Sequence, residues 1–70
     1  MLPLTFANID EDCIIRKVNG SPEVKKHLEN LGFVEGGTVS IISKTEGNLI
    51  VNVKGARVAL NKEMASKIMI

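Results

Sequence analysis

The chain has 70 residues, of which 44% are hydrophobic and 24% charged, and its formal net charge is +1. A chain of this size can hold one core, and this composition is typical of a globular domain and not of a disordered segment. The balanced charge, the absence of Trp and Tyr and the presence of only two Phe residues disfavour nucleic-acid binding, which uses basic patches and aromatic stacking. We therefore expect a single domain over residues 1–70 and no nucleic-acid partner.

The sequence also disfavours membrane insertion and export. No apolar run approaches the roughly 20 residues that a spanning helix needs, and residues 1–10 lack the pattern of a signal peptide. Cys13 is the only cysteine, so an internal disulfide is excluded, whereas small domains in oxidising compartments usually carry several. We expect a cytoplasmic protein with no direct membrane insertion.

The first half of the chain predicts one strand and one helix. Residues 13–18 form a β-branched run that ends at an Asn-Gly turn, while residues 1–12 show no clear pattern and are expected to lack regular structure. Ser21 can cap a helix that begins at Pro22, and Gly32 supplies the left-handed stop. The spacing of three and four predicts a buried helix face made of Val24, His27, Leu28 and Leu31.

After the helix the apolar period changes to two, which indicates strands. Three antiparallel strands are predicted near residues 39–44, 49–53 and 56–60, with Val39, Ile41 and Ser43 on one face and Ser40, Ile42 and Lys44 on the other. Turns are expected at residues 46–48 and 54–55, and Asn61 can cap a short helical turn. Residues 67–70 could form a last strand that pairs with the first.

The predicted fold class is therefore α+β, mainly β, with the helix between strands 1 and 2. About five short antiparallel strands favour a small closed or nearly closed barrel, since closure removes exposed edges. The apolar positions expected to close this barrel are Leu28, Leu31, Val51, Val53, Val58 and Leu60.

Residues that could carry catalysis do not form a convincing set. Cys13 and His27 could make a thiolate pair, but each is better explained by packing, Cys13 within an apolar strand and His27 beside core positions. The acidic run of residues 10–12 is typical of a solvated loop. We expect no catalytic residues and no cofactor.

The sequence gives equally little support for a metal site or a phosphate site. Zinc sites usually need about four ligands in recognisable spacings, and the chain has no such spacing. His27 with Glu23 or Glu29 could form a weak surface site, but a solvated helix face explains these residues better. The glycines of residues 32–37 lack the Lys-Ser/Thr ending of a phosphate loop and more readily serve the backbone. No metal ligands are predicted.

Two segments carry a resemblance to a known family. Residues 28–36 follow the pattern L-x-x-L-G-F-x-x-G, and residues 53–60 follow V-x-G-x-x-V-A-L, with Ala65 and Ile68 completing a final A-x-x-I. In this order and spacing the segments resemble the ferrous iron transport protein A family, FeoA, over most of residues 3–70. The sequence departs from the family pattern near Glu11-Asp12, where Gly is frequent, and at Glu35, where Pro is frequent.

The resemblance implies an SH3-like cytoplasmic domain that supports bacterial Fe²⁺ uptake by acting on the permease FeoB, whose cytosolic part carries a GTPase domain. It implies a non-enzymatic accessory protein that works through protein contacts. Two alternatives stay open: an SH3-like regulatory domain of a metal-dependent transcriptional repressor, and a small metal carrier. Self-association is also left open.

Two candidate surfaces could meet such a partner. One is the exposed helix side at Lys25, Lys26 and Glu29. The other is the loop at Gly36 and Gly37, together with the turn at Gly47 and Asn48, because loops on a rigid scaffold are common binding elements.

Overall fold

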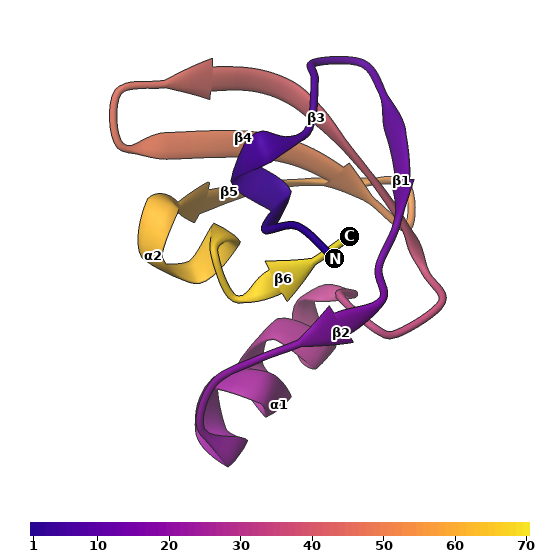
Figure 1. The fold of residues 1–70 in the computed structure, drawn as a ribbon, viewed down its shortest axis with the longest axis vertical. Coiled ribbons are helices and arrows are strands. Elements are labelled where there is room, and N and C mark those ends of the chain that lie inside the picture. Colours follow the sequence, from indigo (N-terminus) through magenta and orange to yellow (C-terminus); the bar gives the residue numbers. More distant parts are fainter.

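The structure, a computed structural model, describes all 70 residues and contains six strands, two α-helices and a short 3₁₀ helix. In chain order these are η1 (Leu4–Phe6), β1 (Asp12–Ile14), β2 (Lys17–Val18), α1 (Pro22–Leu31), β3 (Thr38–Thr45), β4 (Asn48–Val53), β5 (Ala56–Asn61), α2 (Lys62–Ala65) and β6 (Ile68–Met69). The antiparallel order β1-β3-β4-β5 makes a four-stranded sheet, and β2 pairs with β6 in a second one (Figure 1). The predicted class, mainly antiparallel β with one main helix and an SH3-like fold, is confirmed.

The predicted first strand is divided between the two sheets. Its first part, β1, pairs with β3, but at Ile15 the backbone bonds to Gly36 and Gly37 instead. The Arg16 N–H then donates to the Met69 carbonyl at 2.8 Å, and β2 continues alongside β6. The prediction of one continuous strand is therefore wrong, because the chain changes partner at Ile15 and so connects the two sheets. On the opposite side β5 pairs only with β4, and hydrogen bonding does not close the sheet into a barrel.

The N-terminal segment, expected to lack regular structure, is part of the fold. Leu2 and Ile70 exchange two backbone hydrogen bonds, of 2.9 and 2.7 Å. These bonds hold the N-terminal segment alongside the C-terminal end of the β2–β6 sheet. The η1 turn then places the Leu4 side chain in the core, with no exposed surface. That expectation is wrong because the segment is ordered by pairing with the C-terminus, which no local pattern reveals.

Helix α1 begins and ends where the sequence predicts. The Val24 N–H donates to the Ser21 hydroxyl at 3.3 Å, and Gly32 has a φ of 110°. Two bonds close the C-terminus, from the Gly32 N–H to the Glu29 carbonyl and from the Phe33 N–H to the Leu28 carbonyl, which is the pattern of a Schellman motif.

The buried face of α1 is narrower than predicted. Leu28 is fully buried, whereas Val24 and Leu31 are only half-buried and His27 is exposed. The placement of His27 on the buried face is therefore wrong. Other elements cover only a narrow strip of the helix surface, on which Leu28 lies. A buried face chosen from a spacing of three and four is therefore too wide.

The three predicted strands form the expected meander of β3, β4 and β5. Lys54 and Gly55, with φ of 50° and 76°, make the type I′ turn between β4 and β5. A bulge between Ile41 and Ser43 interrupts β3. Ser43 therefore pairs with Ile50 on the outer face, and the predicted alternation is wrong beyond Ile41.

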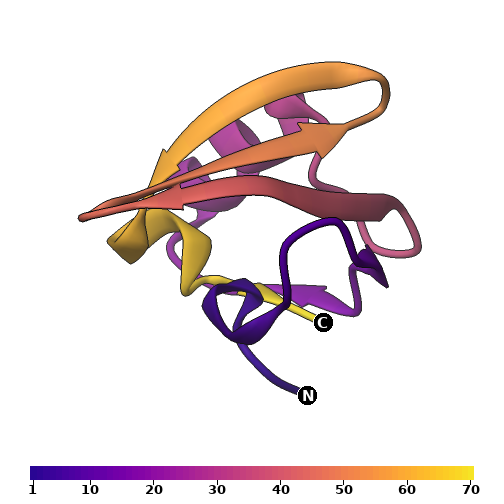
Figure 2. The same ribbon diagram turned by 90° about the horizontal axis from the view of Figure 1, so that it is seen from above.

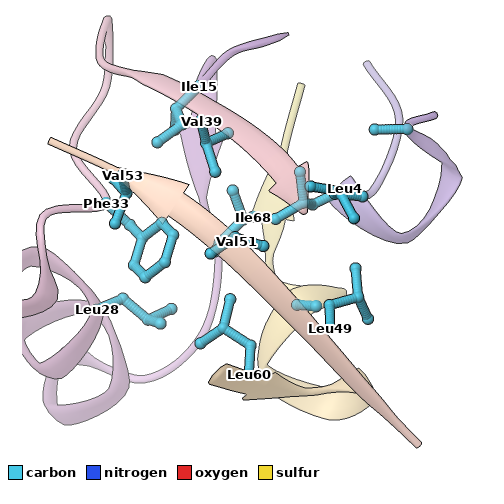
Figure 3. Packing of buried hydrophobic residues seen from close by; sticks show 13 residues of the cluster. Leu4, Ile15, Leu28, Phe33, Val39, Leu49, Val51, Val53, Leu60 and Ile68 are labelled. Atoms are coloured by element: carbon cyan, nitrogen blue, oxygen red, sulfur yellow. The ribbon is translucent and has the colours of Figure 1, made fainter. Parts of the chain in front are cut away.

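The core lies between the four-stranded sheet, α1 and the β2–β6 sheet, as the views in Figure 2 and Figure 3 show. Four of the six positions expected to close it are buried, and Leu31 and Val58 pack against it while half-buried. The 13 buried hydrophobic residues are Leu4, Ala7, Ile15, Leu28, Phe33, Val39, Ile41, Leu49, Val51, Val53, Leu60, Ala65 and Ile68.

Candidate functional site

A pocket of about 310 Å³ lies where α1 meets the loop that follows it, and we refer to it as the α1 pocket. Its lining residues are Val18, Lys25, Glu29, Phe33, Val34 and Glu35. The turn at Gly32 reverses the chain direction, so that the segment after the helix comes back against it. The result is a site with apolar residues from two segments, β2 and the loop after α1, and, among its lining residues, one basic and two acidic side chains.

A second pocket of about 280 Å³, the sheet pocket, lies on the outer face of the four-stranded sheet. None of its lining residues is hydrophobic; they are Asp12, Thr38, Ser40, Asn52, Lys54 and Gly55. Ser40 pairs with Asp12 on one side and with Asn52 on the other, so these three side chains form a row across the outer face. Because none of its lining residues is hydrophobic, this pocket is the weaker candidate for a protein contact.

The structure separates the predicted partner-binding residues into three groups. Lys25 and Glu29 line the α1 pocket, while Lys26 is exposed on the same helix but does not line it. Gly36 and Gly37 directly follow the pocket residue Glu35.

The two predicted loops do not form one surface. Gly36 and Gly37 precede β3, whereas Gly47 and Asn48 follow it, so the eight-residue strand separates them. An extended strand rises about 3.3 Å per residue, which places the two turns at opposite ends of the sheet. The grouping of Gly47 and Asn48 with the first loop as one candidate surface is therefore wrong.

Gly36 and Gly37 have a clear role in the backbone. The Gly36 N–H donates to the Ile15 carbonyl and the Ile15 N–H donates to the Gly37 carbonyl, each at 2.8 Å. Gly36 also has a φ of 84°, a region that favours glycine. These bonds hold the chain where it passes between the two sheets, as expected for glycines that serve the backbone.

Sequence reasoning missed four members of the α1 pocket: Val18, Phe33, Val34 and Glu35. Val18 reaches it through β2, whose pairing with β6 joins residues some fifty positions apart and leaves no local signal. For Glu35 a signal existed, since this position carries a charge where the resembling family often has Pro.

Cys13 is placed for packing. It pairs with buried Val39 and packs against the core, and its Sγ lies 3.7 Å from the Glu11 carbonyl oxygen. Burial raises the pKa of the Cys13 thiol, and the negative charges of Glu11 and Asp12 raise it further. A higher pKa leaves less thiolate at neutral pH, and the thiolate is the nucleophile.

We predict that Cys13 in the folded protein reacts with iodoacetamide more slowly than in the urea-unfolded chain at about pH 8, and that its rate keeps rising at higher pH. Mass spectrometry of timed samples measures both rates. Equal rates would show that neither burial nor the two carboxylates protects the thiol.

His27 and Cys13 are not brought together. His27 is on the exposed side of α1, and Cys13 lies on β1 with its acidic neighbours. No group of three or more His, Cys, Asp and Glu side chains is arranged to hold a metal ion. No helix is both long enough and apolar enough to cross a membrane.

These features define a small SH3-like domain with two surface pockets, of which only the α1 pocket is lined by hydrophobic residues. The family model of the FeoA domain matches residues 2–70. The chain therefore belongs to the FeoA domain family.

Several known proteins are similar to this chain. A provisionally named Fe(2+) transport protein A of Methanocaldococcus jannaschii is 30% identical over 70 residues, which cover 100% of this chain and 85% of that protein. The crystal structure of an iron uptake regulatory protein, FeoA, is 25% identical with a TM-score of 0.87, covering 97% of this chain and 90% of the other. The FeoA of Stenotrophomonas maltophilia, crystallised with zinc and described as a procaryotic SH3 domain protein, is 25% identical with a TM-score of 0.81, covering 94% and 85%.

The same fold occurs in a manganese-dependent transcriptional repressor. This chain superimposes on it with a TM-score of 0.84, with 94% of this chain matching 38% of the repressor. The identity is 14%, so the match shows a common fold and nothing about function.

Proposed function

We propose that this chain is a non-enzymatic accessory domain of ferrous iron uptake, which acts in the cytoplasm by binding and modulating a GTPase-linked permease of the FeoB type. The observation that carries the proposal is the FeoA family match over residues 2–70. The name of the Methanocaldococcus jannaschii relative, a Fe(2+) transport protein A, points to the same process.

The α1 pocket is the surface that we propose for the permease. Val18 and Val34 are half-buried there and offer apolar area, while Lys25, Glu29 and Glu35 are exposed. Protein interfaces commonly combine an apolar centre with a charged rim, in which the charges select the partner and guide its approach. The matching surface on the permease would present an apolar side chain between charged ones.

The neighbouring lysines of α1 allow a matched test. Lys25 lines the pocket and Lys26 does not, although both are exposed and one residue apart. We expect Lys25→Glu to weaken binding to the permease by about tenfold, with a stronger effect at low salt, because exposed charges are screened within about 8–10 Å at physiological salt. Lys26→Glu makes the same change in net charge and should leave binding within about twofold of wild type.

Binding is measured by pull-down and by titration with the cytosolic GTPase-containing domain of the permease, and in parallel with full-length permease in membranes. Circular dichroism confirms that both variants are folded. Equal loss in the two variants would remove the α1 pocket from the interface and leave only a general charge effect. No association with either form of the permease would refute the proposed function itself.

The alternative function, a regulatory domain of a metal-dependent repressor, has only a shared fold behind it, because the manganese-dependent repressor is 14% identical to this chain. The likeness to the FeoA proteins is stronger, since they reach 25% to 30% identity and the repressor 14%. The family match therefore supports the transport role first.

A further inference from the structure

Strand β5 forms an unprotected edge of the four-stranded sheet. It is last in the strand order, and it pairs only with β4. Natural proteins usually protect such edges with proline, a bulge, a short strand or several charges. β5 has six residues in unbroken register, no proline and a single charged side chain.

The register shows which backbone groups of β5 point outward. The type I′ turn makes Val53 and Ala56 a hydrogen-bonded pair, and such pairs alternate along an antiparallel ladder. The Lys62 N–H, which donates to the Gly47 carbonyl at 3.1 Å, continues the same alternation. The N–H and C=O groups of Arg57 and Ala59 therefore face away from β4.

These outward groups have no partner within the chain. None of the backbone hydrogen bonds outside regular elements, and none of the side-chain hydrogen bonds, involves Arg57 or Ala59. Both residues are exposed, so a further strand could approach them. Two N–H donors and two C=O acceptors, spaced as one strand requires, are available at this edge.

The charge around this edge has one sign. Residues 54–62 contain Lys54, Arg57 and Lys62 and no acidic residue, and all three basic side chains are exposed. A second copy of the chain added at this edge would bring six positive charges together. An extended segment with carboxylates would instead neutralise them.

We propose that the β5 edge binds an extended, acidic segment of another protein as an additional antiparallel strand. Residues opposite each other in a ladder share a face, so the residue opposite Arg57 would carry a carboxylate on the outer face. The residue opposite Val58 would be apolar, because Val58 is half-buried against the core and an inner-face neighbour would complete its burial. This mode of recognition takes affinity from main-chain bonds and specificity from alternate side chains.

The test uses a synthetic peptide with free ends blocked, Glu-Thr-Val-Thr-Val-Glu-Val-Glu, whose first Glu lies near Lys62 and whose second lies opposite Arg57. The ladder itself covers only β5, so the first Glu lies beyond the last pair, next to Lys62 at the start of α2. The peptide is titrated into the ¹⁵N-labelled wild-type chain. We expect saturable shifts of the Arg57 and Ala59 amide signals below about 1 mM peptide, and slower hydrogen exchange of these two amides in the complex.

Two N-methylated peptides give a matched control that leaves the protein unchanged. The peptide residues opposite Arg57 and Ala59 direct their N–H groups toward β5, and the residue opposite Val58 directs its N–H away. N-methylation opposite Ala59 should weaken binding by at least about tenfold, while N-methylation opposite Val58 should weaken it far less. Replacing every Glu by Lys should abolish binding at low salt.

Two protein variants complete the design. Ala59→Pro removes an outward N–H at an edge position where proline is tolerated, and Arg57→Glu reverses the central charge; each should weaken binding by about tenfold. The proposal is overturned if shifts map to another surface, if both N-methylated peptides bind alike, or if no saturation occurs. It is also overturned if the two amides become protected with rising protein concentration and no peptide, because the occupant would then be a second copy.

Discussion

Phe33→Ala is expected to lower the free energy of unfolding by about 3–5 kcal/mol, the range found for large aromatic side chains in cores. Phe33 is 1% exposed and is the largest fully buried side chain. It lies beside Leu28 and Val53, at the point where α1, β4 and the loop after the helix meet (Figure 3). A cavity at this point would remove contacts from all three.

The chain provides a control of identical chemistry. Phe6, the only other phenylalanine, is 67% exposed on the η1 turn, so Phe6→Ala should change the free energy of unfolding by less than about 0.5 kcal/mol. Urea titrations measure the free energy of unfolding of both variants, which are compared at an equal slope of that free energy against urea concentration. A 70-residue domain has little stability in reserve, and Phe33→Ala is expected to be partly unfolded at 37 °C. Similar midpoints for the two variants would show that Phe33 does not hold the core together.

Elements defined by neighbouring residues could be predicted from the sequence. The helix start at Ser21 and Pro22, the stop at Gly32 and the turn at Lys54-Gly55 each depend on the conformational preferences of one or two residues. The three-stranded meander follows from them, because short turns leave adjacent strands no other partner.

Features that depend on distant parts of the chain could not be predicted. Residues 13–18 read as one strand because their side chains suit a strand throughout, and only Gly36-Gly37 and Met69 show where they change partner. The order of the N-terminal segment depends on Ile70, the last residue of the chain.

The bulge in β3 and the narrow buried line of α1 are also long-range effects. Beyond the bulge Lys44 pairs with Leu49, and its ammonium group lies 3.4 Å from the Thr5 carbonyl oxygen. The extra residue in β3 thus turns the Lys44 side chain toward the N-terminal segment. Leu31 suits a core position by spacing, yet it packs against the core while remaining half-buried.

The candidate site also has a part that could be predicted from the sequence and a part that could not. Lys25 and Glu29 could be chosen because charges at helical spacing mark an exposed face. The apolar part of the α1 pocket could not, since it is assembled from Val18 of β2 and from Phe33 and Val34 of the loop that returns after the helix. The outward groups of β5 lay beyond sequence reasoning too, because a predicted barrel implies that no edge remains free.

Gly32→Val is expected to destabilise the domain by at least about 2 kcal/mol, through two separable effects. At a φ of 110° any L side chain is strained, and left-handed backbone costs a non-glycine residue about 1–2 kcal/mol. A Cβ at this position would lie 3.5 Å from carbons of Val53 and Lys54, which is ordinary contact, so Gly32→Ala should show the backbone strain alone. The additional methyl groups of valine have no such room, and their overpacking adds about 1–3 kcal/mol.

Thermal unfolding of both variants, followed by circular dichroism, separates the two effects. We expect the midpoint to fall in the order wild type, Gly32→Ala, Gly32→Val. Gly55→Ala is the control for a positive φ without neighbours, since a Cβ there would have nothing within 4 Å. An unfolding midpoint of Gly32→Ala equal to that of wild type would contradict this prediction. The two hydrogen bonds from Gly32 and Phe33 that close the helix could then form without left-handed backbone, and the course of the chain into the α1 pocket would not depend on glycine.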